Sequence, residues 1–307
     1  MYTGIDIGGT KCAVVTGGEN AEVNGKIKFE TGPVEKTYKK ICDAVRALGV
    51  GKAIGISCGG PLDAEKGIIM SPPNLPGWDN IPICEMLENT FGVPAYLKND
   101  ADACALAEWK HGAGRGCSHM IFMTFGTGLG AGMILNGKLY TGACSAAGEA
   151  GHVRLSPFGP VGCGKQGSFE GFCSGSGIKQ LGQAYAKEKI QQGKSVSFCK
   201  SLEDMDRITA KSIAICAGQG CRDALAVYSL CGEMLGRGLS VLIDILNPER
   251  IVLGSIFQRS EELLRPSMER VIAEECHAAN AAACSIVPAE LGDRIGDIAA
   301  LMAAGGN

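Results

Sequence analysis

The sequence contains no block of like charges, no long apolar run and few aromatic residues. Its 307 residues carry a formal net charge of −3, from 29 Lys and Arg against 32 Asp and Glu. Without a basic cluster, nothing in the chain indicates nucleic-acid binding by phosphate neutralisation. No stretch approaches the roughly 18 apolar residues that a membrane helix needs. The sequence therefore predicts a protein with neither a nucleic-acid nor a membrane partner.

Features that mark secreted proteins are also missing. Residues 1–15 lack the charged segment and long apolar stretch of a signal peptide. The 15 cysteines are odd in number and include no Cys-x-x-Cys pair, unlike a secreted disulfide framework. We interpret most of them as small buried apolar residues in a reducing compartment. The sequence predicts a soluble, cytoplasmic protein.

Two similar patterns of strand, glycine turn and strand each open one half of the chain. The first is expected at Tyr2–Ile7 and Cys12–Thr16, and the second at Met120–Phe125 and Ala131–Leu135. The length favours two domains of ordinary size. The other expected strands and helices are Ala53–Ser57, Ala95–Leu97, Arg250–Leu253, Tyr38–Leu48, Ala101–Lys110, Arg222–Leu246 and Ile295–Ala304. Strands and helices thus alternate, as in an α/β protein.

Both glycine turns have the composition of a phosphate-binding loop. Glycines let backbone N–H groups approach a phosphate closely, because no Cβ stands in the way. In the first turn, Asp6–Lys11, the Thr10 hydroxyl is a further donor, and Asp6 could hold Mg²⁺ directly or through water. The second, Thr124–Gly130, has the same design. Each taken alone could equally be an ordinary glycine hairpin, and neither is a Walker A loop.

A carboxylate follows the strand expected at Ala95–Leu97. Asn99 and Asp100 stand at the carboxyl end of that strand, where α/β sheets place ligands. Asp100 could accept the proton of an attacking hydroxyl group. Either residue could also cap the following helix, and capping is compatible with catalysis.

A second set of polar residues lies further along the chain. Glu149 and His152 occur in Gly148-Glu149-Ala150-Gly151-His152, and Glu170 follows in Phe169-Glu170-Gly171. Two carboxylates and a neutral imidazole suit the vicinal hydroxyls of a sugar, since each can accept a hydrogen bond. A lone histidine is more often structural, but Glu149 three residues away favours a functional role.

Taken together, these residues resemble the ROK family (repressors, uncharacterised frames and sugar kinases) within the actin–hexokinase fold. The matching motifs run in order along nearly the whole chain. They are Asp6–Lys11, Gly59-Gly60-Pro61-Leu62-Asp63, Pro73-Asn74-Leu75, Asn99-Asp100, Gly126–Gly130, Gly148–His152, Asn247-Pro248-Glu249-Arg250 and Val252-Leu253-Gly254.

The resemblance implies an α/β fold of two actin-like (ribonuclease H-like) domains flanking a deep cleft, formed by residues 1–112 with 293–307 and by residues 113–292. Asp100 would be the general base. The implied sugar ligands are Asn99, Glu149, His152 and Glu170, with Gly60 and Asn74 assisting. The implied ATP-binding residues are Asp6, Gly8, Gly9, Thr10, Lys11, Gly126, Thr127, Gly128 and Gly254. ATP would be the co-substrate, accompanied by Mg²⁺.

The chain departs from the family at its structural zinc site. Members commonly carry Cys-x-Cys-Gly-x-x-Gly-Cys-x-Glu after the histidine, but aligned backwards from Glu170 the three cysteine positions are Val161, Cys163 and Ser168. His152 and Cys163 are the only remnants, so we expect no bound metal. The sequence leaves one alternative undecided, a rearranged metal site that uses Cys173 or Cys144. We expect apolar packing around Val161 and Phe158 to fix this loop instead.

The function implied is ATP-dependent phosphorylation of a hexose or N-acylhexosamine hydroxyl, with glucose as the first choice. The residues do not identify the sugar or the hydroxyl. The alternatives are a sugar-binding transcriptional regulator of the same family and a sugar-binding protein without kinase activity. A regulator needs a DNA-binding module, usually a helix-turn-helix, and we identify none in the sequence. The resemblance also implies a homodimer.

Overall fold

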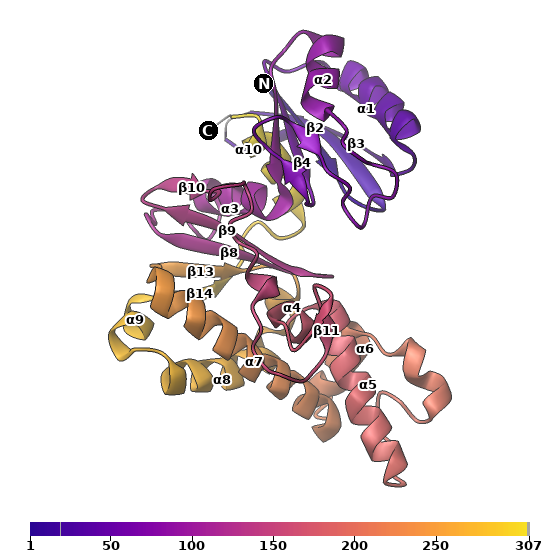
Figure 1. Cartoon of the computed structure of the whole chain (residues 1–307), viewed down its shortest axis with the longest axis vertical. Helices are drawn as coiled ribbons and strands as arrows, with labels where there is room; N and C mark the ends of the chain where they lie inside the picture. The colour runs from indigo at the N-terminus through magenta and orange to yellow at the C-terminus, as the bar shows by residue number, and fades with distance from the viewer. Residues whose placement is uncertain (19, 306–307) are drawn as a thin grey trace. The chain divides into compact units, whose positions relative to one another are not determined.

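The computed structural model describes residues 1–18 and 20–305, and they fall into two compact units (Figure 1). Unit 1 comprises Met1–Phe122, Gly132–Gly148 and Glu290–Asn307, and unit 2 comprises Met123–Ala131 and Glu149–Ala289. The division passes through two strands, β8 (Met120–Phe125) and β9 (Leu129–Leu135). The domain limits expected from the sequence lie elsewhere and stay a prediction.

Unit 1 is built on a five-stranded sheet that gathers strand ends at one edge. The strand order is β3 (Val23–Glu30), β2 (Lys11–Gly17), β1 (Tyr2–Ile7), β4 (Ile54–Cys58) and β7 (Ala95–Asn99). β1, β4 and β7 are parallel, and their registers align Ile7 with Cys58 and Cys58 with Asn99. The residues that follow these three strands therefore emerge at the same edge of the sheet.

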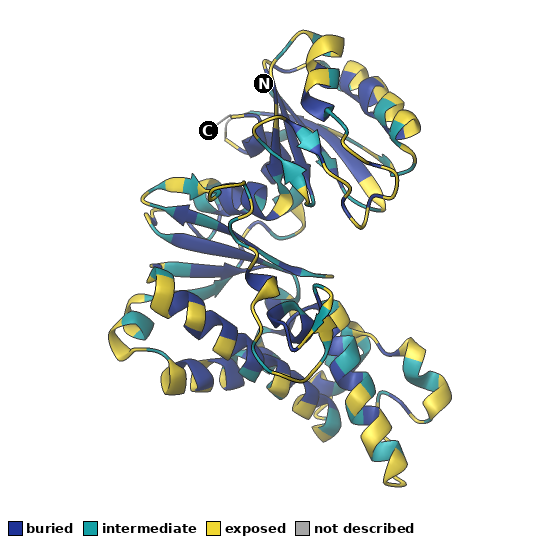
Figure 2. Ribbon diagram, in the orientation of Figure 1, coloured by how far each residue is buried: buried dark blue, intermediate teal, exposed yellow. Residues whose placement is uncertain are grey.

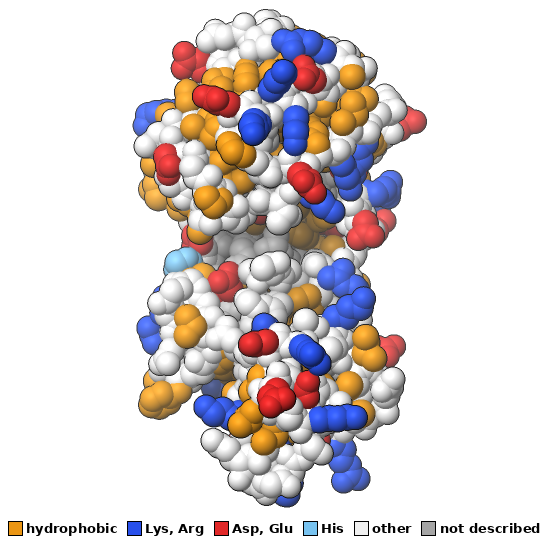
Figure 3. Space-filling view, turned by 90° about the vertical axis from the view of Figure 1, so that its right-hand side faces the viewer, with side chains coloured by type: hydrophobic (Ala, Val, Ile, Leu, Met, Phe, Trp, Pro, Cys, Tyr) orange, Lys and Arg blue, Asp and Glu red, His pale blue; other side chains and the backbone are white. Residues whose placement is uncertain are grey.

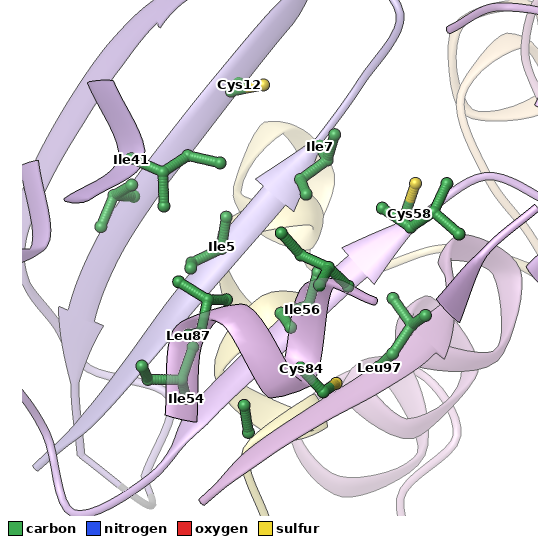
Figure 4. Packing of buried hydrophobic residues seen from close by; sticks show 14 of the residues in the cluster. Ile5, Ile7, Cys12, Ile41, Ile54, Ile56, Cys58, Cys84, Leu87 and Leu97 are labelled. Atoms are coloured by element: carbon green, nitrogen blue, oxygen red, sulfur yellow. The ribbon is translucent and has the colours of Figure 1, made fainter. Parts of the chain in front are cut away.

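Helices cover both faces of this sheet. Successive side chains of a strand point to opposite faces, and β4 is buried at every position, so both faces must be covered. On one face, Ile5, Ile7 and Ile56 pack against Ile41 of α1 (Val34–Leu48) and Leu87 of α2 (Ile83–Phe91) (Figure 4). The other face receives α3 (Asp100–His111) and α10 (Ile295–Ala303). Gly4 and Gly55 allow this contact, since a Cβ on either would overlap the backbone of α10 or of the residue after it.

The second sheet has the order β10 (Lys138–Tyr140), β9, β8, β13 (Arg250–Leu253) and β14 (Ser285–Pro288). The helices of unit 2 are α4 (Phe169–Phe172), α5 (Gly175–Gln191), α6 (Ala210–Gly218), α7 (Arg222–Leu246), α8 (Ile256–Glu275) and α9 (Ala278–Ala283). α8 packs closely on α7, because a side chain at Gly232 or Gly236 of α7 would collide with it. Figure 2 shows that the facing sides of these helices are buried.

Short elements complete the two units. They are β5 (Leu62–Asp63), β6 (Ile68–Ile69), β11 (Val161–Gly162) and β12 (Lys165–Gln166), with 3₁₀ turns at Ala150–His152, Leu202–Arg207 and Gly292–Arg294. Acidic and basic side chains are interspersed over the face drawn in Figure 3. Within the described residues, no helix combines the length and apolar character needed to cross a membrane.

Most of the elements expected from the sequence are confirmed. β1, β8, β13 and α7 have the expected bounds, whereas α1 begins at Val34 rather than Tyr38 and β9 begins at Leu129 rather than Ala131. β3 and α8 were not among the expected elements. β3 exposes every second residue and carries lysines there, so its apolar content is low for a strand.

Candidate active site

The first glycine turn joins β1 to β2 in unit 1. Its Gly8 carbonyl accepts a hydrogen bond of 2.6 Å from the Thr31 hydroxyl. A Cβ on Gly9 would lie 2.5 Å from the Asn74 carbonyl oxygen, so only glycine fits there without displacing that segment. The remaining residues of the turn are exposed: Thr10 and Lys11. The turn is thus a small fixed loop with polar side chains at its surface, and its role in binding phosphate stays a prediction.

Asp6 lies in β1 just before this turn, in an unfavourable place for a negative charge. Burial raises the pKa of its carboxyl to about 7, and the charges of Asp100 and Asp297 add to this effect. Lys26 and Lys28 lower the pKa in part, and Lys26 is itself paired with Asp297. A divalent cation would relieve the repulsion between these carboxylates. Because Mg²⁺ is usually held by one or two carboxylates together with substrate phosphates, Asp6 fits the predicted metal-binding role.

The junction of β7 and α3 carries Asn99 and Asp100. The Ala101 N–H donates to Asn99 Oδ1 over 2.9 Å and to Asp100 Oδ1 over 2.8 Å. Both side chains therefore help to cap α3, as one of the alternative interpretations expected. This capping engages Oδ1 of Asp100 and leaves Oδ2 to face other residues of unit 1.

The other predicted residues of unit 1 gather around Asp100. A Cβ on Gly59 would lie 3.8 Å from Asp100 Oδ2 and 3.7 Å from Asn74 Nδ2. A Cβ on Gly60 would lie 3.4 Å from Asn99 Nδ2. The Asp100 side chain reaches solvent, yet protein atoms surround it closely, and this desolvation raises the pKa of its carboxyl above the ordinary value. A carboxylate of raised basicity beside two amides is suited to orient a hydroxyl and accept its proton.

The second glycine turn opens onto a cavity of about 880 Å³ in unit 2. Gly126 and Thr127 line this cavity, and so does Ser255, the residue that follows Gly254 at the end of β13. Gly126 N–H donates to Gly128 O over 3.1 Å, which closes the turn. Of the residues predicted to bind ATP, Gly126 and Thr127 therefore line the cavity, and Gly254 is represented in the lining by its neighbour Ser255.

Three cationic side chains line the same cavity but were not predicted. Lys179 comes from α5, Lys211 from α6 and Arg259 from α8. Other lining residues missed by the sequence analysis are Ser176, Thr209, Tyr228 and Ser260. These residues are far apart in the sequence and belong to no motif, so only the packing of the helices brings them together. Among the described residues that line the cavity none is acidic, so the lining favours an anionic ligand.

Glu149 and His152 stand at the two ends of a single 3₁₀ turn. His152 Nε2 lies 3.6 Å from Glu149 Oε2, and both side chains are more than half exposed. They therefore present one acceptor carboxylate and one imidazole at the surface of unit 2, and their role as sugar ligands stays a prediction.

Glu170 differs from these two residues because protein groups already engage its carboxylate. Oε2 accepts the Leu129 N–H and Oε1 accepts the Cys163 N–H, each over 3.0 Å. Glu170 lies at the start of α4, where Ser168 is the N-cap residue. Each oxygen retains a second lone pair, so the side chain can still accept a sugar hydroxyl.

The residues at the family's zinc positions do not fit a structural zinc site. The buried Ser168 hydroxyl donates to Gly162 O over 2.8 Å and accepts the Gly171 N–H over 3.0 Å, so it is committed to the fold. Burial and the charge of Glu170 raise the pKa of the Cys163 thiol to about 12, which disfavours the thiolate that zinc binds. Val161 has no ligand atom. Cys173 is buried and donates to Cys231 O over 3.6 Å.

The expectation that apolar packing fixes this loop is wrong. Val161 is 46% exposed and Phe158 is 78% exposed. Polar contacts hold the loop instead. The Gln180 amide bonds both the N–H and the carbonyl of Val161, each over 2.9 Å. Together with Ser168 and Glu170, these hydrogen bonds replace the metal as the constraint on the 161–168 segment.

We accordingly predict that the purified protein holds no tightly bound zinc. Zinc sites of this structural kind need four ligands, and only His152 and Cys163 remain of the family's set. Elemental analysis of protein prepared without added metal should give zinc far below one equivalent. Near-stoichiometric zinc that survives a chelator and disappears in His152→Ala would contradict the prediction.

Comparison with known proteins agrees with this description. The ROK family model matches residues 2–305. The glucokinase of Thermotoga maritima is 32% identical over 277 residues, which cover 88% of this chain and 86% of that protein. The xylose repressor of Caldicellulosiruptor bescii is 31% identical over 278 residues, or 90% of this chain and 67% of the repressor.

A solved structure extends the comparison to the fold. The ROK family glucokinase from Streptomyces griseus, determined in complex with glucose and AMPPNP, has a TM-score of 0.78 and 29% identity. The match covers 100% of this chain and 99% of that one. The expected α/β class with two actin-like domains is thereby confirmed.

Proposed function

The chain belongs to the ROK family, and we propose that it is a kinase that transfers the γ-phosphoryl group of ATP to a hydroxyl of a hexose or N-acylhexosamine. One observation carries the proposal: Asp100 turns a carboxylate oxygen of raised basicity toward Gly59 and Asn74, with Asn99 beside it. This arrangement suits an acceptor hydroxyl, because the amides can orient it while Asp100 removes its proton.

Each unit contains groups that the proposed reaction would use. In unit 2, the Gly126–Gly128 turn and the cavity with Lys179, Lys211 and Arg259 would bind the nucleotide. In unit 1, the Gly8–Lys11 turn would contribute further backbone donors to the phosphates. Phosphoryl transfer depends mainly on positioning and charge neutralisation, so these donors and cations are the groups that it requires. Mg²⁺ held near Asp6 would neutralise phosphate charge.

Glucose is the sugar that we propose first, because Glu149, His152 and Glu170 are all present. A coupled assay of ATP consumption over a panel of hexoses and N-acylhexosamines tests the activity and identifies the sugar. The proposal expects sugar-dependent ADP formation well above the rate with ATP alone. The similarity to a repressor leaves a sugar-binding regulator as the second candidate, and ligand binding without turnover would favour it. The family resemblance further supports a cytoplasmic homodimer.

We predict that Glu149→Ala raises the KM for the sugar about tenfold, since the sugar hydroxyl loses a charged acceptor and a hydrogen bond to a charged group contributes about 1.5–3 kcal/mol. The KM for ATP should stay nearly unchanged. Initial rates measured while each substrate is varied in turn provide the check. A fall in ATP affinity without a change in the sugar KM would assign Glu149 to the nucleotide instead.

A further inference from the structure

The Glu170 side chain contacts three segments of unit 2 that are separate in the sequence. Its Oε2 accepts the Leu129 N–H, and a Cβ on Gly128 would lie only 2.7 Å from the same oxygen. Its Oε1 accepts the Cys163 N–H. A Cβ on Gly151 would lie 3.3 Å from Glu170 Cβ. One half-buried carboxylate thus lies against the glycine turn, the 161–166 hairpin and the 3₁₀ turn that carries Glu149 and His152.

These contacts fix the end of the glycine turn, where it leads into β9. Leu129 is the first residue of β9 and directly follows Gly128, so its hydrogen bond fixes the place where the turn becomes a strand. Hydrogen bonds from backbone N–H groups to a carboxylate are roughly twice as strong as those between neutral groups. The absence of a side chain at Gly128 lets the carboxylate approach this closely.

We propose that Glu170 is a positioning residue for the nucleotide: its carboxylate holds the Gly126–Gly128 turn in the conformation that binds the ATP phosphates. The proposal rests on the proposed function, which assigns this turn to ATP. Glu170 is also a predicted sugar ligand. A sugar hydroxyl bound to it would restrict the carboxylate further and thereby favour the ordered turn. Sugar and ATP would then bind with positive coupling, and the coupling would be reciprocal.

Glu170→Gln is the informative substitution because it preserves size and shape while replacing one acceptor oxygen with a donor. The amide nitrogen would face either Leu129 N–H or Cys163 N–H, so one of the two hydrogen bonds is lost. If the turn is ordered in only a fraction of the molecules, the apparent Kd of its ligand equals the intrinsic Kd divided by that fraction. With no sugar present, we expect AMP-PNP with Mg²⁺ to bind about tenfold more weakly than to the wild type, as measured by calorimetry.

Two control variants separate this effect from other causes. Gln180→Leu releases Val161 and loosens the hairpin without touching Leu129, so it should bind AMP-PNP like the wild type. Glu149→Gln alters the predicted sugar ligands but not the glycine turn, and it should likewise keep nucleotide affinity. Added glucose should tighten AMP-PNP binding in the wild type and do so less in Glu170→Gln.

Each outcome decides the matter. Wild-type AMP-PNP affinity in Glu170→Gln, with a raised KM for glucose, would overturn the proposal and leave Glu170 as a sugar ligand only. Equal weakening in Gln180→Leu would overturn it too, because general loosening of the hairpin would then suffice. If the wild type itself binds no AMP-PNP, the proposed function fails together with this inference. Should Glu170→Gln not fold, amide exchange in the wild type decides: the Leu129 N–H should be protected, and fast exchange would refute the proposal.

Discussion

Replacing Asp100 with asparagine should lower kcat about 100-fold or more, the usual scale for the loss of a general base. The KM values for sugar and ATP should stay close to those of the wild type. Asparagine can still accept the Ala101 N–H through Oδ1, so the cap of α3 survives and the fold should too. What it loses is the ability to accept a proton from the attacking hydroxyl.

Two measurements accompany this variant. Asp43→Asn, a surface change in α1 where Asp43 pairs with Arg46, is the matched control and should keep full activity. Because the surrounding protein desolvates the Asp100 carboxyl and raises its pKa, the loss of wild-type kcat on acidification should begin at a higher pH than for an aspartate of ordinary pKa. A variant Asp100→Asn that retains more than half of the wild-type kcat would remove Asp100 from the mechanism.

Asp6→Asn should make the protein more stable at neutral pH while impairing catalysis. The pKa of Asp6 is about 7 in the folded protein, against an ordinary value of 3.8. The native state therefore binds more protons than the unfolded state between these values, and stability falls as pH rises through this window. Asparagine cannot ionise and avoids this cost. The size of this pKa shift sets the expected gain in the free energy of unfolding. Because Asp6 is partly exposed and solvent screens its charge, we expect a gain of about 1–4 kcal/mol.

The pH dependence distinguishes this mechanism from a general packing effect. The difference in unfolding free energy between Asp6→Asn and the wild type should reach its largest value near about pH 8 and should vanish by about pH 4. Urea unfolding at several pH values, without nucleotide or metal, measures it directly. Two results would contradict the idea that ionised Asp6 destabilises the folded protein. One is a stability difference that does not change with pH, and the other is a variant less stable than the wild type at about pH 8.

The central part of the site could be predicted because its determinants are local. Gly8 and Gly9 identify a tight turn between two apolar strands, and Asn99-Asp100 lie at the carboxyl end of a third strand. The carboxyl ends of parallel strands lie at the same edge of a sheet, so residues that occur at these ends in the sequence can be predicted to lie close together in the structure. The register of β4 and β7 then brings Gly59, which follows β4, close to Asp100, whereas Asn74 reaches them from a turn outside the sheet.

The parts that could not be predicted depend on contacts between distant segments. Lys179, Lys211 and Arg259 sit on three different helices, and no spacing in the sequence relates them. The role of Ser168 was also hidden, since aligning it with a cysteine identifies the lost ligand but not the capping hydrogen bonds that replaced it. Backbone donors to Glu170 leave no trace in the sequence at all, because every residue except proline carries an N–H.

The most direct test of the account is to identify the product of the reaction. The wild-type protein, ATP, Mg²⁺ and each sugar of the panel would be incubated and followed by phosphorus NMR, with Asp100→Asn in parallel. We expect one sugar phosphate ester to appear for each ADP formed with at least one sugar, and almost none with Asp100→Asn. ATP and sugar that stay unchanged across the whole panel, with protein that is shown to be folded, would contradict the assignment as a sugar kinase.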